Sequence, residues 1–122
     1  NKIIASIVLY SPLVGVTHQE RAFIAQSISY RYGGRGLTLK YKHLLNENYD
    51  KYSKKLGKAL RLAYQISGGG VNILPQTKLI IHKKTLSLAL KNNASLLFDP
   101  TINRRLESLA KEYNYESTVT NY

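Results

Sequence analysis

The sequence predicts an α+β fold, in which a helical first part, residues 1–70, precedes a small antiparallel sheet with one packing helix in residues 71–122. Two observations lead to this prediction. Within residues 17–67, apolar side chains recur at steps of three and four, which is typical of helices. After the triple glycine 68–70, apolar and polar residues alternate as in half-buried strands. The triple glycine therefore marks the boundary between two predicted domains.

Residues that typically begin and end helices predict that the first elements of the chain are helical. Residues 2–10 resemble the last turns of a helix, although their β-branched side chains leave a short strand as the alternative. Thr17 and Glu20 fit a capping box, so we expect a helix from about His18 to Tyr32. Gly33-Gly34 should end this helix. One of its sides should be lined by Phe23, Ile24, Ser27, Ile28 and Arg31.

A second helix is predicted over residues 51–67, after an irregular stretch, residues 33–50. In that stretch residues 37, 39 and 41 alternate like a strand. Gly57, in the middle of the helix, costs about 1 kcal/mol relative to alanine if exposed, and its lack of a side chain suits close approach of a neighbouring helix. An apolar stripe that should face the core consists of Tyr52, Leu56, Ala59, Leu60, Ala63 and Ile66.

The second part begins with a predicted hairpin. Residues 77–82 and 85–90 should pair as strands around a turn at Lys83-Lys84, and alternation in the second of them indicates a half-buried strand. Residues 95–98 are a candidate for a short third strand. Residues 116–120 are expected to return as an edge strand.

One helix is predicted between these strands. Asp99-Pro100 is a strong start signal, because aspartate caps a helix and proline suits its first position. Asn114 should end the helix. Its apolar face would be formed by Ile102, Leu106, Leu109, Ala110 and Tyr113.

The positive charge is clustered. The chain has a net charge of +11, and nine of its 18 Lys and Arg residues lie between Arg31 and Arg61 with only two acidic residues. Such clustering favours an anionic partner, whereas a codon bias toward lysine would spread the charge over the surface. A solvated basic helix face is the alternative. The candidate polyanion-binding residues are Arg31, Arg35, Lys40, Lys42, Lys51, Lys54, Lys55, Lys58 and Arg61.

No set of residues indicates catalysis. There is no cysteine, the three histidines are scattered, and neither glycine cluster continues as a phosphate-binding loop. We therefore predict no catalytic residues, no metal site and no cofactor in this chain. No apolar run reaches the roughly 18 residues that span a membrane. The sequence starts at Asn1 and lacks methionine, so we expect a piece of a longer protein with functional residues elsewhere.

The order of four segments resembles a known family. SPLVGVTHQERAFIAQSISYRYGG, KKLGKALRLAYQIS, ILPQTKLIIHKKTLSLAL and INRRLESLAKEYNYE are similar to the C-terminal region of exopolyphosphatase / guanosine pentaphosphate phosphatase (Ppx/GppA) proteins, in the branch found in alphaproteobacteria. The resemblance covers residues 11–116. It implies a bacterial, cytoplasmic hydrolase as the parent protein.

The resemblance also implies which domains of the parent protein carry out catalysis. In this family two N-terminal actin-like domains hold magnesium, the catalytic carboxylates and the nucleotide or phosphate chain. A helical domain related to HD phosphohydrolases and a small α+β domain follow. The chain would be the back half of the helical domain, residues 1–70, plus the terminal domain. Its Tyr30-Arg31-Tyr32 and Arg61-Leu62-Ala63-Tyr64 depart from the His and Asp of working HD sites, so the helical part should be a scaffold without catalytic metal.

Three functions follow as expectations. The chain is an accessory part that binds polyphosphate or pppGpp through its basic helix and steers it toward the catalytic domains of the same protein. Alternatively, it is a non-catalytic nucleic-acid-binding module that reads backbone charge. A third reading is that the region forms a homodimer and its charge only solvates it.

Overall fold

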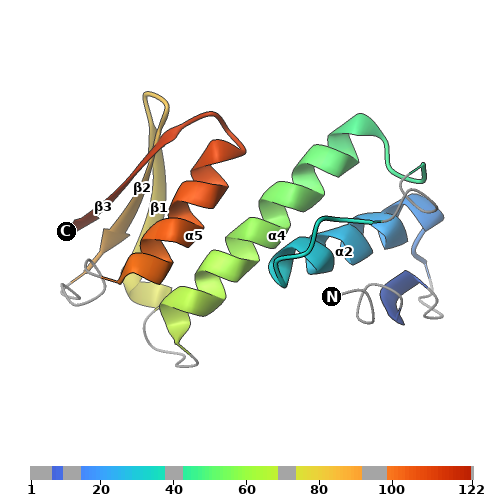
Figure 1. The fold of residues 1–122 in the computed structure, drawn as a ribbon, viewed down its shortest axis with the longest axis horizontal. Helices are drawn as coiled ribbons and strands as arrows, with labels where there is room; N and C mark the ends of the chain where they lie inside the picture. Colours follow the sequence, from blue (N-terminus) through green and yellow to red (C-terminus); the bar gives the residue numbers. More distant parts are fainter. Residues whose placement is uncertain (1–6, 10–14, 38–42, 69–73, 92–98, 122) are drawn as a thin grey trace. The chain divides into compact units, whose positions relative to one another are not determined.

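The computed structural model describes residues 7–9, 15–37, 43–68, 74–91 and 99–121 (Figure 1). These segments combine helices with a three-stranded sheet, so the predicted α+β class is confirmed. The elements, in chain order, are α2 (His18–Arg31), α4 (Glu47–Ser67), a 3-10 turn η1 (Leu74–Gln76), β1 (Thr77–His82), β2 (Thr85–Leu90), α5 (Pro100–Lys111) and β3 (Glu116–Asn121).

The chain forms two compact units, Asn1–Arg61 (the first unit) and Leu62–Tyr122 (the second unit), which divide within α4. The predicted domain boundary at the triple glycine stays a prediction. Several predicted features lie outside the described residues: residues 2–6 and 10, residues 39 and 41, and the short strand at residues 95–98. Residues 7–9 are helical, in agreement with the helix expected there.

The cap predicted for α2 is present. The Glu20 backbone N–H donates to Thr17 Oγ1 over 3.1 Å, which satisfies one of the free amide groups at the helix start. The Glu20 carboxylate accepts from the Thr17 hydroxyl over 3.0 Å, whereas the capping box placed it on a backbone N–H. The helix ends as expected, since Gly33 has a φ of +80° and the Gly34 N–H donates to the Ser29 carbonyl over 2.7 Å.

The buried side of α2 consists mostly of small and polar residues, which let another backbone approach closely. Of the residues that line one side of the helix in the sequence, Ser27 is buried, whereas Phe23, Ile24 and Ile28 are half-buried. The buried residues of α2 are Ala22, Ala25, Gln26, Ser27 and Ser29.

The close approach occurs at Gly57. A Cβ atom at this position would lie 2.5 Å from the Ser27 carbonyl oxygen and 2.5 Å from Tyr30 Cβ. Both distances are far below van der Waals contact, so only glycine fits between α2 and α4 here. The interpretation of Gly57 as a site of close helix approach is confirmed.

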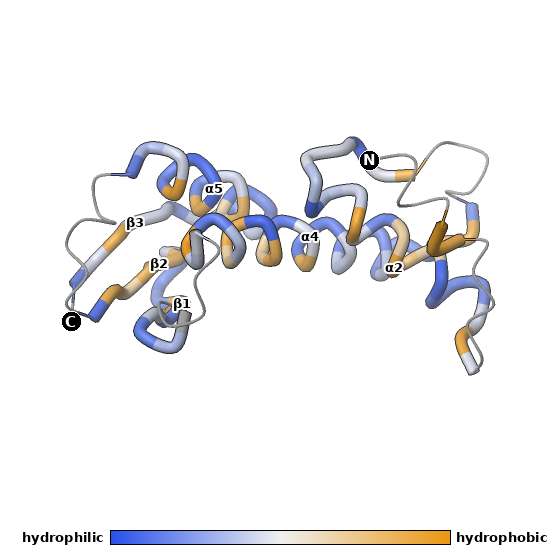
Figure 2. Tube along the Cα trace, turned by 90° about the horizontal axis from the view of Figure 1, so that it is seen from below, coloured by the Kyte–Doolittle hydropathy of each residue, from blue (hydrophilic) through white to orange (hydrophobic). Residues whose placement is uncertain are grey.

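The apolar stripe predicted for α4 is not a single buried face. Tyr52, Leu56 and Leu60 are 56%, 42% and 45% exposed, and only Ile66 of the predicted set is fully buried. Figure 2 shows hydrophobic and hydrophilic residues alternating within the turns of this helix. The prediction was wrong because it assumed one partner for the whole helix.

The two ends of α4 lie in different units. In the first unit the buried residues of the helix are Ser53 and Gly57, and in the second unit they are Leu62 and Ile66. Each end of the helix therefore belongs to a different core.

The predicted hairpin is confirmed to the residue. β1 and β2 pair antiparallel from Thr77 opposite Leu90 to His82 opposite Thr85. Lys83 and Lys84 have φ values of +46° and +61°, which gives the two-residue turn the type I′ geometry that suits twisted strands.

The sheet is mixed rather than antiparallel, which corrects the predicted fold. β3 pairs parallel to β2, with Leu88 opposite Val119. The reason is the connection: α5 lies between the two strands in sequence and packs against both, so the chain returns in the same direction. The cap of α5 is as predicted, since Asp99 Oδ1 accepts from the Thr101 N–H over 2.8 Å. Four of the five predicted apolar positions are buried: Ile102, Leu106, Leu109 and Ala110.

Candidate polyanion-binding site

The basic residues of α4 form one continuous arc. At about 100° per residue they fall within about 120° of the helix circumference, and their Cα atoms span about 15 Å along its axis. The exposed apolar side chains of Tyr52, Leu56 and Leu60 occupy the opposite side. We call this set the cationic arc; its members are Lys51, Lys54, Lys55, Lys58 and Arg61.

One flank of the cationic arc reaches the C-terminal end of α2. Lys54 Nζ lies 5.7 Å from the centre of the Tyr30 ring, in cation–π range. The Arg61 guanidinium lies so close to Gly33 that a Cβ atom there would be 2.7 Å from Arg61 Nη1. Arg31, in the last turn of α2, stacks on Tyr32 at 4.7 Å. Cations are favoured at a helix C-terminus by the partial negative charge of its carbonyls.

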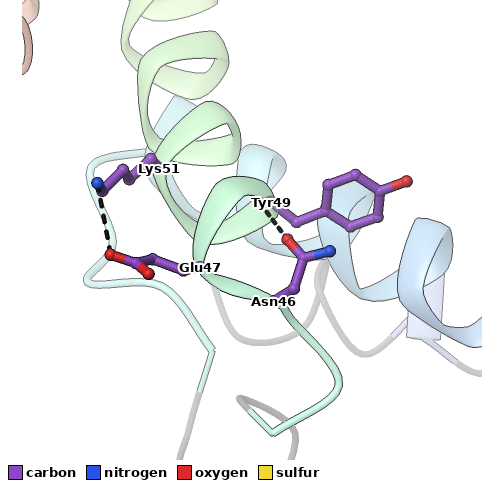
Figure 3. A network of polar contacts seen from close by, with 4 residues as sticks. All are labelled: Asn46, Glu47, Tyr49 and Lys51. Atoms are coloured by element: carbon purple, nitrogen blue, oxygen red, sulfur yellow. Dashed lines mark hydrogen bonds and ion pairs between the residues drawn. The ribbon is translucent and has the colours of Figure 1, made fainter.

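On the other flank Lys51 is exposed and Lys55 is half-buried. Lys51 Nζ lies 3.5 Å from Glu47 Oε1, and both side chains are exposed (Figure 3). Such a surface pair is worth less than about 1 kcal/mol, so an anionic ligand can compete for the lysine. Lys55 Nζ lies 5.7 Å from the centre of the Tyr52 ring. Figure 3 also shows the start of α4, where Asn46 Oδ1 accepts from the Tyr49 N–H over 2.7 Å.

Arg35 is exposed on a loop that is fixed to α2. The Gly36 N–H donates to Ser29 Oγ over 3.2 Å, and the Leu37 N–H donates to Gln26 Oε1 over 3.1 Å. The Tyr30 hydroxyl donates to the Arg35 carbonyl oxygen over 3.4 Å. These bonds hold the loop that carries the Arg35 guanidinium beside the end of α2.

Gln26 is a structural centre that the sequence analysis missed. Its Nε2 donates to Asp50 Oδ1 over 2.7 Å and to Ser53 Oγ over 2.8 Å, while its Oε1 accepts from the loop. One buried amide thus links α2, α4 and residues 36–37. The only signal in the sequence was a glutamine among small residues, Ala22, Ala25 and Ser29, on a helix.

The structure places seven of the nine candidate residues in the first unit, on one side of α4, in the last turn of α2 and on the loop that follows α2. The other two, Lys40 and Lys42, lie outside the described residues. Lysine ammonium groups and arginine guanidinium groups in this arrangement can hold several phosphates at once, with arginine suited to bidentate contact.

No group of three or more His, Asp or Glu side chains among the described residues could hold a metal ion. None of the helices in the described segments is both long and apolar enough to cross a membrane.

The chain matches a family model. The model of the family described as exopolyphosphatase, C-terminal, covers residues 3–119. No curated protein matches the chain.

Proposed function

Because the chain belongs to the family of exopolyphosphatase C-terminal regions, we propose that it is the accessory C-terminal part of a Ppx/GppA-type phosphatase that hydrolyses polyphosphate or pppGpp. In this proposal catalysis and magnesium belong to actin-like domains of the same protein. A cytoplasmic location, an HD-like origin of residues 1–70 and the alphaproteobacterial branch are parts of the same proposal, and they rest on the sequence resemblance.

The accessory role is to bind the phosphate chain along the cationic arc. The observation that supports this role is that one 120° sector of α4 presents five cations, while the opposite side of the helix is uncharged. A polyanion that follows the helix axis for about 15 Å meets all five. Arg31 and Arg35, at the end of α2, extend the same basic region.

The physical basis of such binding is many weak contacts and the release of counterions. Each neutralised phosphate releases condensed ions, so affinity falls steeply with salt; this relation holds for DNA, and we extend it to polyphosphate by analogy. Flexible lysines suit this role because they follow a mobile chain as point charges.

The test compares two variants of equal net charge. Lys54→Gln/Lys55→Gln/Lys58→Gln removes three charges from the cationic arc, and Lys83→Gln/Lys84→Gln/Lys91→Gln removes three exposed charges from the second unit. Glutamine preserves helix propensity. At low salt, affinity for long-chain polyphosphate should fall about tenfold or more in the first variant and far less in the second. Equal losses would mean that total charge, not the arc, sets the affinity.

A second function, nucleic-acid binding, is favoured by one observation. Tyr52, which was predicted to fill the core, is instead 56% exposed beside Lys55. An exposed aromatic ring next to cations can stack with a nucleobase. Competition separates the two functions. Under our proposal long-chain polyphosphate displaces RNA, short oligonucleotides do not displace polyphosphate, and Tyr52→Leu leaves polyphosphate affinity unchanged.

A further inference from the structure

The arginines among the candidate polyanion-binding residues gather at one end of the cationic arc. Arg31 and Arg35 lie two residues before and two residues after Gly33, and Arg61 is the last member of the arc on α4. The candidate residues that lie farther toward the start of α4 are all lysines. We call Arg31, Arg35 and Arg61 the arginine corner.

Arg61 belongs to this corner through its contact with Gly33. A Cβ atom at Gly33 would lie 2.7 Å from Arg61 Nη1 and 3.0 Å from both Cζ and Nη2. Because these three atoms are almost equally near, the face of the guanidinium lies against the glycine, and its N–H groups, which lie in the guanidinium plane, do not point at it. The missing side chain of Gly33 therefore determines where the Arg61 guanidinium can lie.

Arg31 and Arg35 are held beside the same glycine. Both Cα atoms lie within about 7 Å of the Gly33 Cα atom, because two residues of chain span no more than that. The Arg31 guanidinium stacks on the Tyr32 ring at 4.7 Å. The Arg35 carbonyl oxygen accepts from the Tyr30 hydroxyl over 3.4 Å, so the loop turns back toward α2. Three guanidinium groups thus start from the surroundings of one glycine.

The acidic residues of the first unit lie elsewhere. They are Glu20, in the first turn of α2, and Glu47 and Asp50, in the first turn of α4. Glu20 precedes Arg31, and Asp50 precedes Arg61, by 11 residues each, which is about 16 Å along a helix axis. The C-terminal end of α2 carries about half a negative charge, which three guanidinium charges outweigh. The arginine corner should therefore attract anions.

Arginine and lysine suit different parts of a phosphate chain. An interior phosphate of polyphosphate has two non-bridging oxygens and one negative charge. A terminal phosphate has three such oxygens and can carry a second charge. A guanidinium group binds two oxygens at once through parallel N–H groups, whereas an ammonium group acts as a point charge. Three guanidinium groups therefore match a chain end better than an interior phosphate.

We propose that the arginine corner binds the terminal phosphate of a polyphosphate chain, while the lysines of the cationic arc hold the phosphates that follow it. The chain is then bound in one direction, with its end beside Gly33 and its interior running along α4 toward Lys51. Gly33 is a positioning residue, because it determines where the Arg61 guanidinium lies. This inference rests on the proposed function, since it gives a direction to the ligand of the cationic arc.

Binding of end-capped polyphosphate tests the proposal. The probe is linear polyphosphate just long enough to span the cationic arc, with an alkyl phosphoramidate on each terminal phosphate. This cap removes one oxygen and one charge from each end. The unaltered chain should bind uncapped polyphosphate about tenfold more tightly than capped polyphosphate, because hydrogen bonds between charged groups are the strong ones. Equal affinity for the two probes would overturn the proposal.

Arginine-to-lysine variants test which residues recognise the end, and they keep the net charge. In Arg35→Lys/Arg61→Lys the preference for the uncapped probe should fall to about threefold or less, because lysine cannot bind bidentately. The matched control is Arg104→Lys/Arg105→Lys, which makes the same change on α5 in the second unit and should keep the preference of the unaltered chain. A preference that survives in the first variant, or is lost equally in both, would contradict the assignment.

Gly33 provides a test that leaves every cation in place. Asparagine adopts positive φ angles, so Gly33→Asn is compatible with the φ of +80° but puts a side chain where the Arg61 guanidinium lies. The matched control is Gly68→Asn, because Gly68 has a φ of +53° and nothing lies within 4 Å of the place that its Cβ atom would take. The preference for the uncapped probe should fall in Gly33→Asn and persist in Gly68→Asn; the reverse, or equal preferences, would show that Gly33 does not position Arg61.

Failure of this inference and failure of the proposed function give different results. If capped and uncapped probes bind equally and both lose affinity in Lys54→Gln/Lys55→Gln/Lys58→Gln, the cationic arc holds the chain without a preferred end. The proposed function then stands and the direction of binding is wrong. If the unaltered chain binds neither probe at low salt, the proposed function and the inference both fail.

Discussion

At Gly57, helix propensity and packing oppose each other. Alanine in a helix interior is favoured over glycine by about 1 kcal/mol. At this position, however, the extra methyl group would press on the backbone of α2 at Ser27 as well as on Tyr30. A carbonyl oxygen in a helix cannot move aside as the end of a flexible side chain can, so packing should outweigh propensity.

We therefore expect Gly57→Ala to lower the free energy of unfolding by about 1–3 kcal/mol, as overpacked sites do. Chemical denaturation followed by circular dichroism measures this change. Adding Tyr30→Ala should not restore stability, because the contact with the Ser27 carbonyl remains. An alanine variant more stable than the unaltered chain would contradict the observed helix crossing.

Helix caps, which depend on residues close together in sequence, were predicted correctly, whereas contacts between residues far apart in sequence were not. The caps at Thr17 and Asp99 follow from residues within a few positions of each other, and both are present. Gln26 binds Asp50, which lies 24 residues away. Nothing near Gln26 in sequence identifies that partner, because the contact exists only once α2 and α4 cross.

Among the elements, α4 shows why periodicity alone misassigned a core. Helical spacing identified one apolar stripe, but each unit buries its own residues of the helix. Leu62, which the stripe did not include, is only 1% exposed, whereas Leu56, which it did include, is 42% exposed. The apolar stripe exists in the sequence, but it is not the face of the helix that is buried in the structure.

Two leucine truncations measure this difference. Leu62→Ala should lower the free energy of unfolding by about 2–5 kcal/mol, because it removes buried methyl groups and leaves a cavity. Leu56→Ala should change it by no more than about 0.5 kcal/mol, as surface substitutions usually do. Urea titration of both variants gives the values. Equal losses would show that the predicted stripe is buried after all.

A change in the turn of the β1–β2 hairpin should stabilise the second unit. Lys83 and Lys84 hold positive φ angles that asparagine and glycine adopt more readily, and Asn-Gly is the preferred type I′ turn. Lys83→Asn/Lys84→Gly should raise the free energy of unfolding of the second unit by about 1 kcal/mol. The control Lys83→Gln/Lys84→Gln removes the same charges without easing the backbone. If it stabilises equally, charge rather than turn geometry is responsible.

The parallel direction of β3 was missed although a signal existed. Alternation identifies a strand but not its direction, and β3 was read only as an edge. The order strand, helix, strand from β2 through α5 is the usual pattern of a parallel crossover. Connectivity would have predicted the mixed sheet.

At the scale of the whole molecule, the concentration of cations in one quarter of the sequence predicted one basic surface, and the described members of this set lie in the first unit. Composition could not predict how these side chains are placed around α4. Lys54 lies near the end of α2, whereas Lys51 is exposed beside Glu47. That depends on how the two helices cross.

The salt dependence of polyphosphate binding tests the central claim, that the cationic arc holds the phosphate chain. The logarithm of affinity should fall linearly with the logarithm of salt concentration. The slope for Lys54→Gln/Lys55→Gln/Lys58→Gln should be shallower by about 2–3, one contact for each lysine removed. Lys83→Gln/Lys84→Gln/Lys91→Gln should keep the slope of the unaltered chain. Three identical slopes would show that the arc makes no phosphate contacts.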